Sequence, residues 1–380
     1  MRILMTGPGN CTAMQRPLGW LLESGYPAWF VGRQNPSPRR HADNYHFIQA
    51  LDASQGGGES RATFEANVSL YRRCMTEIKP MMVHAHGLDK ETLWCAKAGL
   101  AAPLVISVWG YLNALLDEPP KALDQATERI VSAAQALIVE SPALASAVRR
   151  RYPAGPRVLT IPLGINVLHF HGDNARQRAQ WRHNLRIADD VFVLLSARGW
   201  GRIYQHDLIV RAFALARPRF RPPVLLAFTL MGRNSQSGEA EHCYREVMQQ
   251  AQSLGLMDAL RVLPNLRHDM MPGLYAMTDA VISYPASDAF PSTLMEAAAC
   301  QRPIVTARLP SYADTFVEFS SGLVEHGQVE QLADALVEVV NQPPAARQAQ
   351  LQQTRDWVVE HYDERRLKAD LLALYAELVA

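Results

Sequence analysis

Short apolar runs alternate with segments of helical periodicity along the first part of the chain. The runs have the Val-, Ile- and Leu-rich composition of strands buried on both faces, and they read RILMT, PAWFVG, MMVHAH, PLVISVWG, ALIVES and RVLTIP. Between them the pattern predicts helices at 64–78, 89–99, 121–134 and 142–151. Such alternation is typical of a parallel sheet covered by helices on both faces.

Two local features interrupt this pattern. An early helix is predicted to end at Glu23 and to hold Pro17 in its first turn, because proline lacks the amide hydrogen that interior helical positions need. Residues 34–58, which include PSP and QGGGES, are predicted to form one long irregular loop.

The alternation restarts in the second half of the chain. Its predicted strands read VFVLLSAR, PVLLAFTLMG, LRVLP, DAVISYP and RPIVTAR, and its predicted helices lie near 205–216, 239–254, 269–277 and 292–300. The stretch PLGINVLHFHGDNARQRAQW between the halves loses the pattern and is predicted to be a linker. At the end of the chain, four leucines at helical spacing form one apolar stripe: Leu367, Leu371, Leu374 and Leu378.

The predicted architecture is therefore α/β, with two tandem Rossmann-like, doubly wound parallel-sheet domains. We place the first domain at 1–167 and the second at 168–360. Ligands of such sheets bind beyond the carboxyl ends of the strands. The residues expected to matter most therefore follow strands, at 7–11, 84–87, 109–113, 198–204, 232–234 and 287–293. We expect these loops to face each other across a cleft between the domains.

Composition excludes several classes of protein. The chain has 380 residues, 48% hydrophobic and 20% charged, which is typical of a soluble globular protein. Its formal net charge of +1 gives no case for nucleic-acid binding. Residues 1–170 hold 17 Lys and Arg against 13 Asp and Glu, a net charge of +4. A mildly basic first half would suit an anionic acceptor or peripheral contact with the inner membrane surface.

Cysteine usage and hydropathy indicate the compartment. The five cysteines are scattered, without a CxxC pair, so the reducing cytosol is the expected setting. The N-terminal apolar run is too short for a signal sequence, and no run approaches the roughly 18 residues of a membrane span. We expect a cytoplasmic protein.

Three motifs follow strands of the first half. GPGN is neither a dinucleotide nor an ATP-binding fingerprint, so it forms either a tight turn or a ligand contact, at Gly9 through its missing Cβ. In HAHG we expect the two histidines to point to opposite faces of the strand, so that at most one points into the cleft. We select His86 as a contact for a sugar hydroxyl or phosphate, with a structural role as an equal alternative. SVWGYLN offers the Trp109 ring as a stacking platform, or as core, and the Asn113 amide.

Two motifs of the second half combine charge with a predicted helix start. In SARGWGR, Arg198 and Arg202 either bind a diphosphate or are solvated. In SDAFPSTLMEAAACQRPIV, Ser292 is predicted to cap a helix whose free amides and dipole favour a phosphate. Glu296, one turn into that helix, could accept both hydroxyls of a ribose, and Asp288 those of a second sugar. A surface turn and an ordinary capped helix are the alternative.

The chain resembles, over nearly its whole length, the GT-B glycosyltransferases of family 4, retaining enzymes that use nucleotide-sugar donors. SDAFPSTLMEAAACQRPIV is similar to the family's E-x7-E region. VLTIPLGINVLHF at 158–170 is similar to its Ile-Pro-Asn-Gly-Val-Asp-x-x-x-Phe hinge. IKPMMVHAHG, SGYPAWFVG and DAVISYP fit the same order.

The resemblance implies a role for each matching residue. Glu296 would bind the ribose, Asp288 the transferred sugar and Arg198 the diphosphate. The remaining donor-site residues would be Arg202, Tyr204, Gly232, Arg233, Phe290, Pro291, Ser292, Thr293 and Leu294. Gly9 and Asn10, with Trp109 and Asn113, would line the acceptor side, and His86 would act with Asp288 and Arg198. The C-terminal helices, about 361–380, would pack back on the first domain.

Four departures from the family pattern matter. Asp288 is one methylene shorter than the family's glutamate. Tyr204-Gln205 replaces the usual Lys-Gly, so Arg202 or the Tyr204 hydroxyl would supply the second phosphate contact. Trp109 replaces a histidine, whose contact falls to His86 or is absent. Gln301 replaces a common glycine.

The expected function is sugar transfer from a nucleotide-diphosphate donor, a UDP-sugar, to a glycan or lipid-linked acceptor in polysaccharide or glycoconjugate biosynthesis. The resemblance implies retention of the anomeric configuration. No D-x-D triplet occurs, so neither a metal nor another cofactor is expected. Alternatives are a sugar-nucleotide epimerase, a phosphorylase, or a glycan- or nucleotide-binding protein that has lost catalysis, as the missing lysine would allow.

Overall fold

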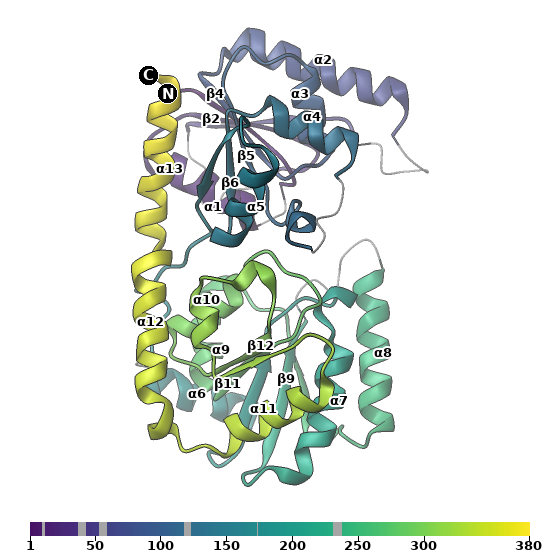
Figure 1. Cartoon of the computed structure of the whole chain (residues 1–380), viewed down its shortest axis with the longest axis vertical. Coiled ribbons are helices and arrows are strands. Elements are labelled where there is room, and N and C mark those ends of the chain that lie inside the picture. Colours follow the sequence, from purple (N-terminus) through teal and green to yellow (C-terminus); the bar gives the residue numbers. More distant parts are fainter. Residues whose placement is uncertain (10–11, 37–42, 53–58, 118–122, 173, 231–237) are drawn as a thin grey trace. The chain divides into compact units, whose positions relative to one another are not determined.

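The computed structural model describes residues 1–380 except 10–11, 37–42, 53–58, 118–122, 173 and 231–237 (Figure 1). The chain divides into two compact units. The first comprises Met1–Leu163 together with Arg365–Ala380, and the second comprises Gly164–Glu364. The C-terminal segment therefore returns to the first unit, as the fold prediction required.

A parallel sheet of seven strands forms the centre of the first unit, in the order β3-β2-β1-β4-β5-β6-β7. The strands are β1 Ile3–Thr6, β2 Ala28–Gly32, β3 Tyr45–Gln49, β4 Met82–His86, β5 Leu104–Ser107, β6 Ala136–Val139 and β7 Arg157–Thr160. The helices are α1 Thr12–Glu23, α2 Arg61–Ile78, α3 Lys90–Lys97, η1 Asn113–Leu116, α4 Gln125–Ala133, α5 Pro142–Arg151 and α13 Glu364–Val379. The fold class predicted from the alternation is confirmed here.

The last helix, α13, covers one face of this sheet together with α1 (Figure 1). Three leucines of the predicted stripe, Leu367, Leu371 and Leu374, are 2–3% exposed and pack in one core cluster with β1 and β2. Each buried leucine stabilises the fold by roughly 2 kcal/mol. The apolar stripe thus joins the end of the chain to the unit in which the chain begins.

Two local predictions for the first unit were wrong. The predicted loop 34–58 contains β3, which pairs in parallel with β2 at the sheet edge. Its half-buried edge position leaves little alternation to detect between turn-forming residues. Helix α1 begins at Thr12, so Pro17 lies in its interior and not in its first turn. The loss of one backbone hydrogen bond there is offset by the buried side chains of Met14, Leu18 and Leu21.

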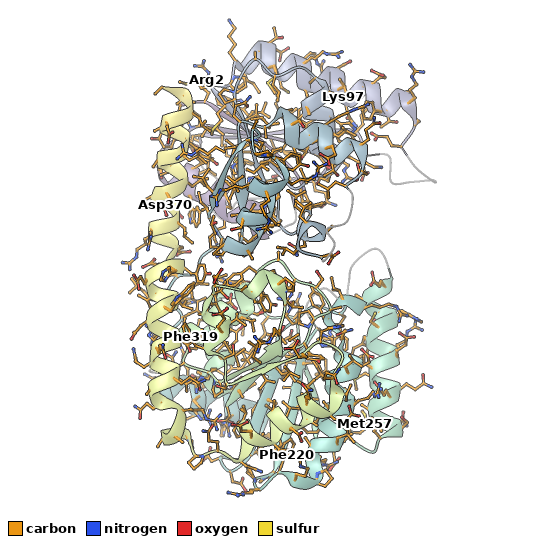
Figure 2. All side chains as sticks on the ribbon, in the orientation of Figure 1. Arg2, Lys97, Phe220, Met257, Phe319 and Asp370 are labelled. Atoms are coloured by element: carbon orange, nitrogen blue, oxygen red, sulfur yellow. The ribbon has the colours of Figure 1, made fainter. Side chains whose placement is uncertain are left out.

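The second unit is built around a parallel sheet of six strands, in the order β10-β9-β8-β11-β12-β13. The strands are β8 Phe192–Ser196, β9 Val224–Thr229, β10 Leu260–Leu263, β11 Ala280–Ser283, β12 Ile304–Ala307 and β13 Gly322–Val324. The helices are α6 Ala175–Leu185, α7 His206–Ala216, α8 Glu239–Ser253, α9 Met271–Met277, α10 Ser292–Ala299, α11 Val329–Asn341 and α12 Gln348–Tyr362. Short 3-10 turns include η2 Arg202–Tyr204, η4 His268–Met270, η5 Pro310–Tyr312 and η6 Phe316–Phe319. Side chains fill the interior of each unit (Figure 2).

The predicted linker is partly helical, which corrects the sequence interpretation. Helix α6, Ala175–Leu185, begins within it and carries few apolar residues. Arg178 and Arg182 of α6 instead pair with Asp279, at 2.7 and 2.5 Å. Because charge pairs and not an apolar stripe hold this helix, hydrophobic periodicity could not detect it.

Both sheets reverse their strand order near the middle, between β1 and β4 in the first unit and between β8 and β11 in the second. Crevices at the carboxyl ends of strands on either side of such a reversal are the usual ligand sites of doubly wound sheets. Across the described ranges, no helix is long and apolar enough to cross a membrane.

Candidate functional site

An ion pair lies where the second sheet reverses its strand order. Arg198 follows β8 and Asp288 follows β11, and these strands are neighbours. Nη2 of Arg198 donates to Oδ2 of Asp288 at 2.7 Å. The side chains are 10% and 12% exposed. Two residues that are 90 positions apart in the sequence thus form a nearly buried charge pair at the carboxyl edge of the sheet.

The Arg198 guanidinium has two further partners. It lies over the ring of Tyr204, 4.5 Å from the ring centroid, and its Nη1 donates to the Thr293 hydroxyl at 3.3 Å. Burial is the largest single influence and would lower the pKa of Arg198, but the Asp288 carboxylate together with Tyr204, Tyr312 and Tyr275 outweighs it, and the pKa is raised overall. The guanidinium therefore remains charged while its plane is fixed by Asp288 and Tyr204.

Tyr312 contacts the same carboxylate. This residue ends η5, after β12, and is 2% exposed. Its hydroxyl donates to Oδ2 of Asp288 at 3.1 Å. Burial, followed by the Asp288 charge, raises the pKa of Tyr312 well above its usual value, so the phenol keeps its proton and acts as the donor.

The second carboxylate of the opening motif, Glu296, lies in α10 and is 2% exposed. Oε2 accepts a hydrogen bond from the Tyr275 hydroxyl at 2.9 Å, and Oε1 lies 3.1 Å from Nε2 of His268. Burial, followed by the Glu296 charge, raises the pKa of Tyr275 well above its usual value. Tyr275 belongs to α9 and His268 to η4, so two other elements hold this carboxylate in place.

Thr293 connects the two carboxylate centres. Its side chain accepts from Arg198, and its backbone carbonyl accepts from the Tyr275 hydroxyl at 3.2 Å. The resulting network extends from Tyr204 to His268 along one edge of the sheet. We call it the charged edge cluster, made up of Arg198, Tyr204, His268, Tyr275, Asp288, Thr293, Glu296 and Tyr312.

The start of α10 differs from the prediction. Pro291, in extended conformation (φ −79°, ψ 128°), occupies the capping position, and Ser292 is the first helical residue. Within the described part of the chain, no side chain caps this helix. Ser292 is therefore not the cap, because the proline ring already sets the backbone that a cap requires. The helix still presents its positive end beside the cluster.

Of the other residues predicted to bind the donor, some lie beside the charged edge cluster and some do not. Phe290 and Leu294 are buried, and Phe290 packs against the ring of Tyr312 at 6.2 Å. Arg202 is exposed and pairs with Glu246 at 3.1 Å, outside the cluster. Gly232, Arg233 and Asn10 lie outside the described residues.

The structure shows how Tyr204, Gln205 and Gln301 fit where the resembled family has other residues. Gln205 has φ +48°, and Gln301, which also replaces a glycine of the resembled family, has φ +54°. Both glutamines therefore adopt the left-handed backbone that glycine adopts most easily, at a cost of roughly 1 kcal/mol each relative to glycine. Tyr204 takes the lysine position with an uncharged ring that supports Arg198, so it adds no positive charge.

The prediction that the two histidines of the first unit point to opposite faces of the strand is wrong. Residues two apart in a strand share a face, and the rings of His84 and His86 lie 4.0 Å apart, both fully buried. His84 bonds to Ser107 at 2.9 Å and to the Tyr375 hydroxyl of α13. His86 accepts from Trp109 Nε1 at 3.3 Å, and its Nε2 has no partner among the described residues. Burial lowers the pKa of His86 to about 3, so it is neutral.

The residues expected on the acceptor side are tied into the first unit. The Trp109 ring stacks on His86, with centroids 6.1 Å apart. A Cβ on Gly9 would lie 2.0 Å from the carbonyl oxygen of Gln34, so packing within the protein requires this glycine. Asn113 begins η1. A cavity beside Trp109 and His84 has room for about one water molecule.

Sequence reasoning missed His268, Tyr275 and Tyr312. Each is recognised only by its contact with a carboxylate. The available signal was position: His268 follows the predicted strand LRVLP, and Tyr312 follows RPIVTAR. In the described ranges, no three His, Cys, Asp or Glu side chains converge as a metal site.

Two parallel, doubly wound sheets in one chain are the architecture of the GT-B fold. Residues 177–357 match the model of the family described as glycosyl transferases group 1. D-inositol 3-phosphate glycosyltransferase of Salinispora tropica is 28% identical over 312 residues, covering 79% of this chain and 64% of that protein. The corresponding protein of Saccharomonospora viridis is 29% identical, covering 79% and 70%.

Solved structures show the same fold. Sucrose-phosphate synthase of Thermosynechococcus elongatus has a TM-score of 0.81 at 19% identity, covering 100% of this chain and 99% of that one. Anabaena HepE in complex with UDP-glucose has a TM-score of 0.76 at 18% identity, covering 99% and 100%. The resemblance is thus confirmed for the fold, which is that of the GT-B glycosyltransferases, and residues 177–357 match the model of the group 1 glycosyltransferases. It spans less than two thirds of the length of the Salinispora tropica relative.

Proposed function

We propose that this protein transfers a sugar from a UDP-sugar to a glycan or lipid-linked acceptor, with retention of the anomeric configuration and without a metal, in polysaccharide or glycoconjugate biosynthesis. The charged edge cluster is the observation that carries the proposal. It combines one fixed guanidinium, one helix start and two separately held carboxylates at the reversal point of the second sheet. An anion and two sets of hydroxyls are the ligand groups that fit it.

Arg198 and the start of α10 would stabilise the leaving diphosphate. Negative charge develops on the leaving group, and preorganised donors act most strongly where water is largely excluded. Arg198 is 10% exposed and held in place by Asp288 and Tyr204, so little reorganisation is needed when the charge appears. The α10 dipole adds to this stabilisation.

Glu296 would bind the ribose of the donor. A carboxylate offers roughly four acceptor positions, and Tyr275 and His268 use two of them. Both oxygens are oriented by separate donors, which suits recognition of a vicinal diol. Asp288 would accept hydroxyls of the sugar being transferred.

The proposed acceptor follows from the names of the relatives and from the net charge of the first part of the chain. The relatives are named for D-inositol 3-phosphate, a phosphorylated polyol. The net charge of +4 in residues 1–170 suits such an anionic acceptor, or a lipid-linked one at the cytoplasmic face of a membrane. We therefore propose an acceptor that carries phosphate, as a soluble polyol phosphate or as a lipid-linked glycan.

The test begins with a thermal-shift screen of nucleotide-sugars, followed by calorimetry with the donor that binds. Replacement Glu296→Ala should lower donor affinity by about 100-fold, because it removes a charged acceptor of two hydroxyls. Glu330→Ala, an exposed acid of the same unit, is the matched control and should bind like wild type. Equal donor affinity in both variants would refute the site.

The reaction is tested by product analysis with D-inositol 3-phosphate and lipid-linked glycans as acceptors. A new glycosidic product with retained configuration, formed equally in EDTA, supports the proposal. Conversion of the UDP-sugar to its epimer without acceptor, or a strict need for inorganic phosphate or a divalent metal, contradicts it.

A further inference from the structure

We propose that Tyr312 is a positioning residue that sets the Asp288 carboxylate against the donor sugar and so helps to determine which sugar is accepted. This inference rests on the proposed function, because it concerns the sugar end of the same donor. It goes beyond that function in assigning a specificity role to a residue outside the motif that carries the two carboxylates.

Two donors from different parts of the sheet converge on one oxygen atom. Arg198, after β8, and Tyr312, after β12, both contact Oδ2 of Asp288, at 2.7 and 3.1 Å. Strand β11, which leads to Asp288, lies between β8 and β12. The carboxylate is therefore held from both sides, and its direction is set by the pair of donors.

The phenol itself is rigidly mounted. Tyr312 is 2% exposed, and its ring meets Phe290 edge to face at a centroid distance of 6.2 Å. The Tyr312 amide donates to the Leu309 carbonyl at 3.0 Å, and its own carbonyl accepts from the Thr315 hydroxyl at 2.6 Å. Because the backbone, ring and hydroxyl of Tyr312 are all held by contacts, the hydroxyl can hold the Asp288 carboxylate in one place.

The length of the side chain at position 288 determines whether its carboxylate fits beside the Tyr312 hydroxyl. A glutamate here, as in the resembled family, would move the carboxylate by about one carbon–carbon bond, ~1.5 Å, toward the groups that now contact it. The Tyr312 hydroxyl and the shorter Asp288 are thus matched in size. The position of the carboxylate decides which sugar hydroxyls it can accept, and a misplaced polar partner discriminates strongly between sugars.

The experiment compares four proteins with wild type: Tyr312→Phe, Tyr284→Phe, Asp288→Glu and the double variant Asp288→Glu/Tyr312→Phe. Tyr284 is the matched control, because its fully buried hydroxyl donates to the Glu325 carbonyl at 2.6 Å, outside the charged edge cluster. The readouts are UDP affinity, and kcat and KM for UDP release from UDP-glucose and from UDP-galactose. These sugars differ at one hydroxyl.

Tyr312→Phe should lower kcat by about 10- to 100-fold, as expected for one hydrogen bond to a charged group, and should change the glucose-to-galactose ratio of kcat/KM. UDP affinity should stay within about 2-fold of wild type, because Glu296 is untouched. Asp288→Glu should be impaired in the wild-type background and recover at least about 5-fold when the Tyr312 hydroxyl is also removed.

Several results would overturn the inference. One is a Tyr312→Phe protein with the kcat and sugar ratio of Tyr284→Phe; another is a double variant no better than Asp288→Glu alone. If wild type binds no UDP-sugar at all, the proposed function fails, and this inference with it. Thermal unfolding of every variant separates loss of folding from loss of positioning.

Discussion

The carboxyl edges of the two sheets have the same topology but hold opposite kinds of chemistry. In the first unit, the imidazoles of His84 and His86 are fully buried and neutral, and their rings lie 4.0 Å apart with their planes tilted by 34°. In the second, Arg198 and Asp288 carry full charges in a pair that is 10–12% exposed. Each edge lies where its strand order reverses, so topology alone does not decide which edge presents ionised groups.

The polar groups of the first edge stabilise the fold, whereas those of the second are suited to binding a ligand. His84 joins β4 to β5 and to α13 through Ser107 and Tyr375, so it ties the end of the chain to the sheet. A buried ion pair is weak support for stability, because desolvation offsets much of the attraction. The Arg198–Asp288 pair is therefore better explained by the ligand chemistry proposed for it.

The largest expected effect comes from breaking the charged pair. Arg198→Ala should lower kcat for sugar transfer by about 100- to 1000-fold, because it removes the main fixed donor to the leaving diphosphate. It also leaves Asp288 buried without its cation, which should cost about 3 kcal/mol of unfolding free energy. Steady-state kinetics and urea denaturation measure both effects. Arg202→Ala is the control: this exposed arginine lies outside the cluster, and a loss as large as that of Arg198→Ala would remove the distinction between them.

Breaking the histidine network of the first unit should affect stability and not donor binding. His84→Ala removes the partners of two buried hydroxyls, so the free energy of unfolding should fall by about 2–4 kcal/mol. Calorimetry should show unchanged affinity for the nucleotide-sugar, because that site is proposed in the second unit. The exposed His183, replaced by alanine, should alter neither quantity. A weaker donor affinity in folded His84→Ala would contradict a purely structural role.

Acid should weaken the fold through its neutral histidines. Burial lowers the pKa of His86 to about 3 and that of His206 to about 4, against an ordinary value of 6.5. Because the folded pKa is depressed, the unfolded state binds the proton first, and stability is lost as the pH falls below about 6.5 toward these values. At pH 5 the loss is about 2 kcal/mol for each histidine. Urea midpoints at pH 7 and pH 5 test this, and an unchanged or higher midpoint at pH 5 would be inconsistent with it.

The smallest expected effect concerns the attachment of α13. Tyr375→Phe deletes only the hydroxyl that contacts His84, so it should lower the free energy of unfolding by about 1 kcal/mol. Urea denaturation measures the change, with Ala373→Gln at an exposed position of the same helix as the reference. Equal midpoints for the two variants would show that the hydroxyl contact adds nothing to this attachment.

Much of the fold could be predicted because buried parallel strands and amphipathic helices have local signatures. The predicted helix at 142–151 coincides with α5, Pro142–Arg151, and the helix near 239–254 closely matches α8. The failures have physical causes. The edge strand β3 lacks a buried run, α6 is held by ion pairs to Asp279, and α1 accommodates an interior proline through its buried face.

The site was predictable only in part, for the same reason. Arg198, Asp288 and Glu296 follow strands or begin a helix, so their place in the motif pointed to them. Tyr312, Tyr275 and His268 have no such local mark. Their importance lies in contacts with carboxylates 21–28 residues away along the chain, and such contacts exist only once strand order is set.

The sequence by itself determined the alternation of strands and helices, the two parallel sheets and the residues at the ends of their strands, because these depend on the periodicity of neighbouring side chains. The tertiary structure alone decided that the His84 and His86 rings contact each other and are neutral, that Arg198 is held by Asp288 over Tyr204, and that Tyr312 contacts the shorter carboxylate. Charge state and hydrogen-bond partners depend on burial and on residues far away in the chain, so only the assembled sheets could supply them.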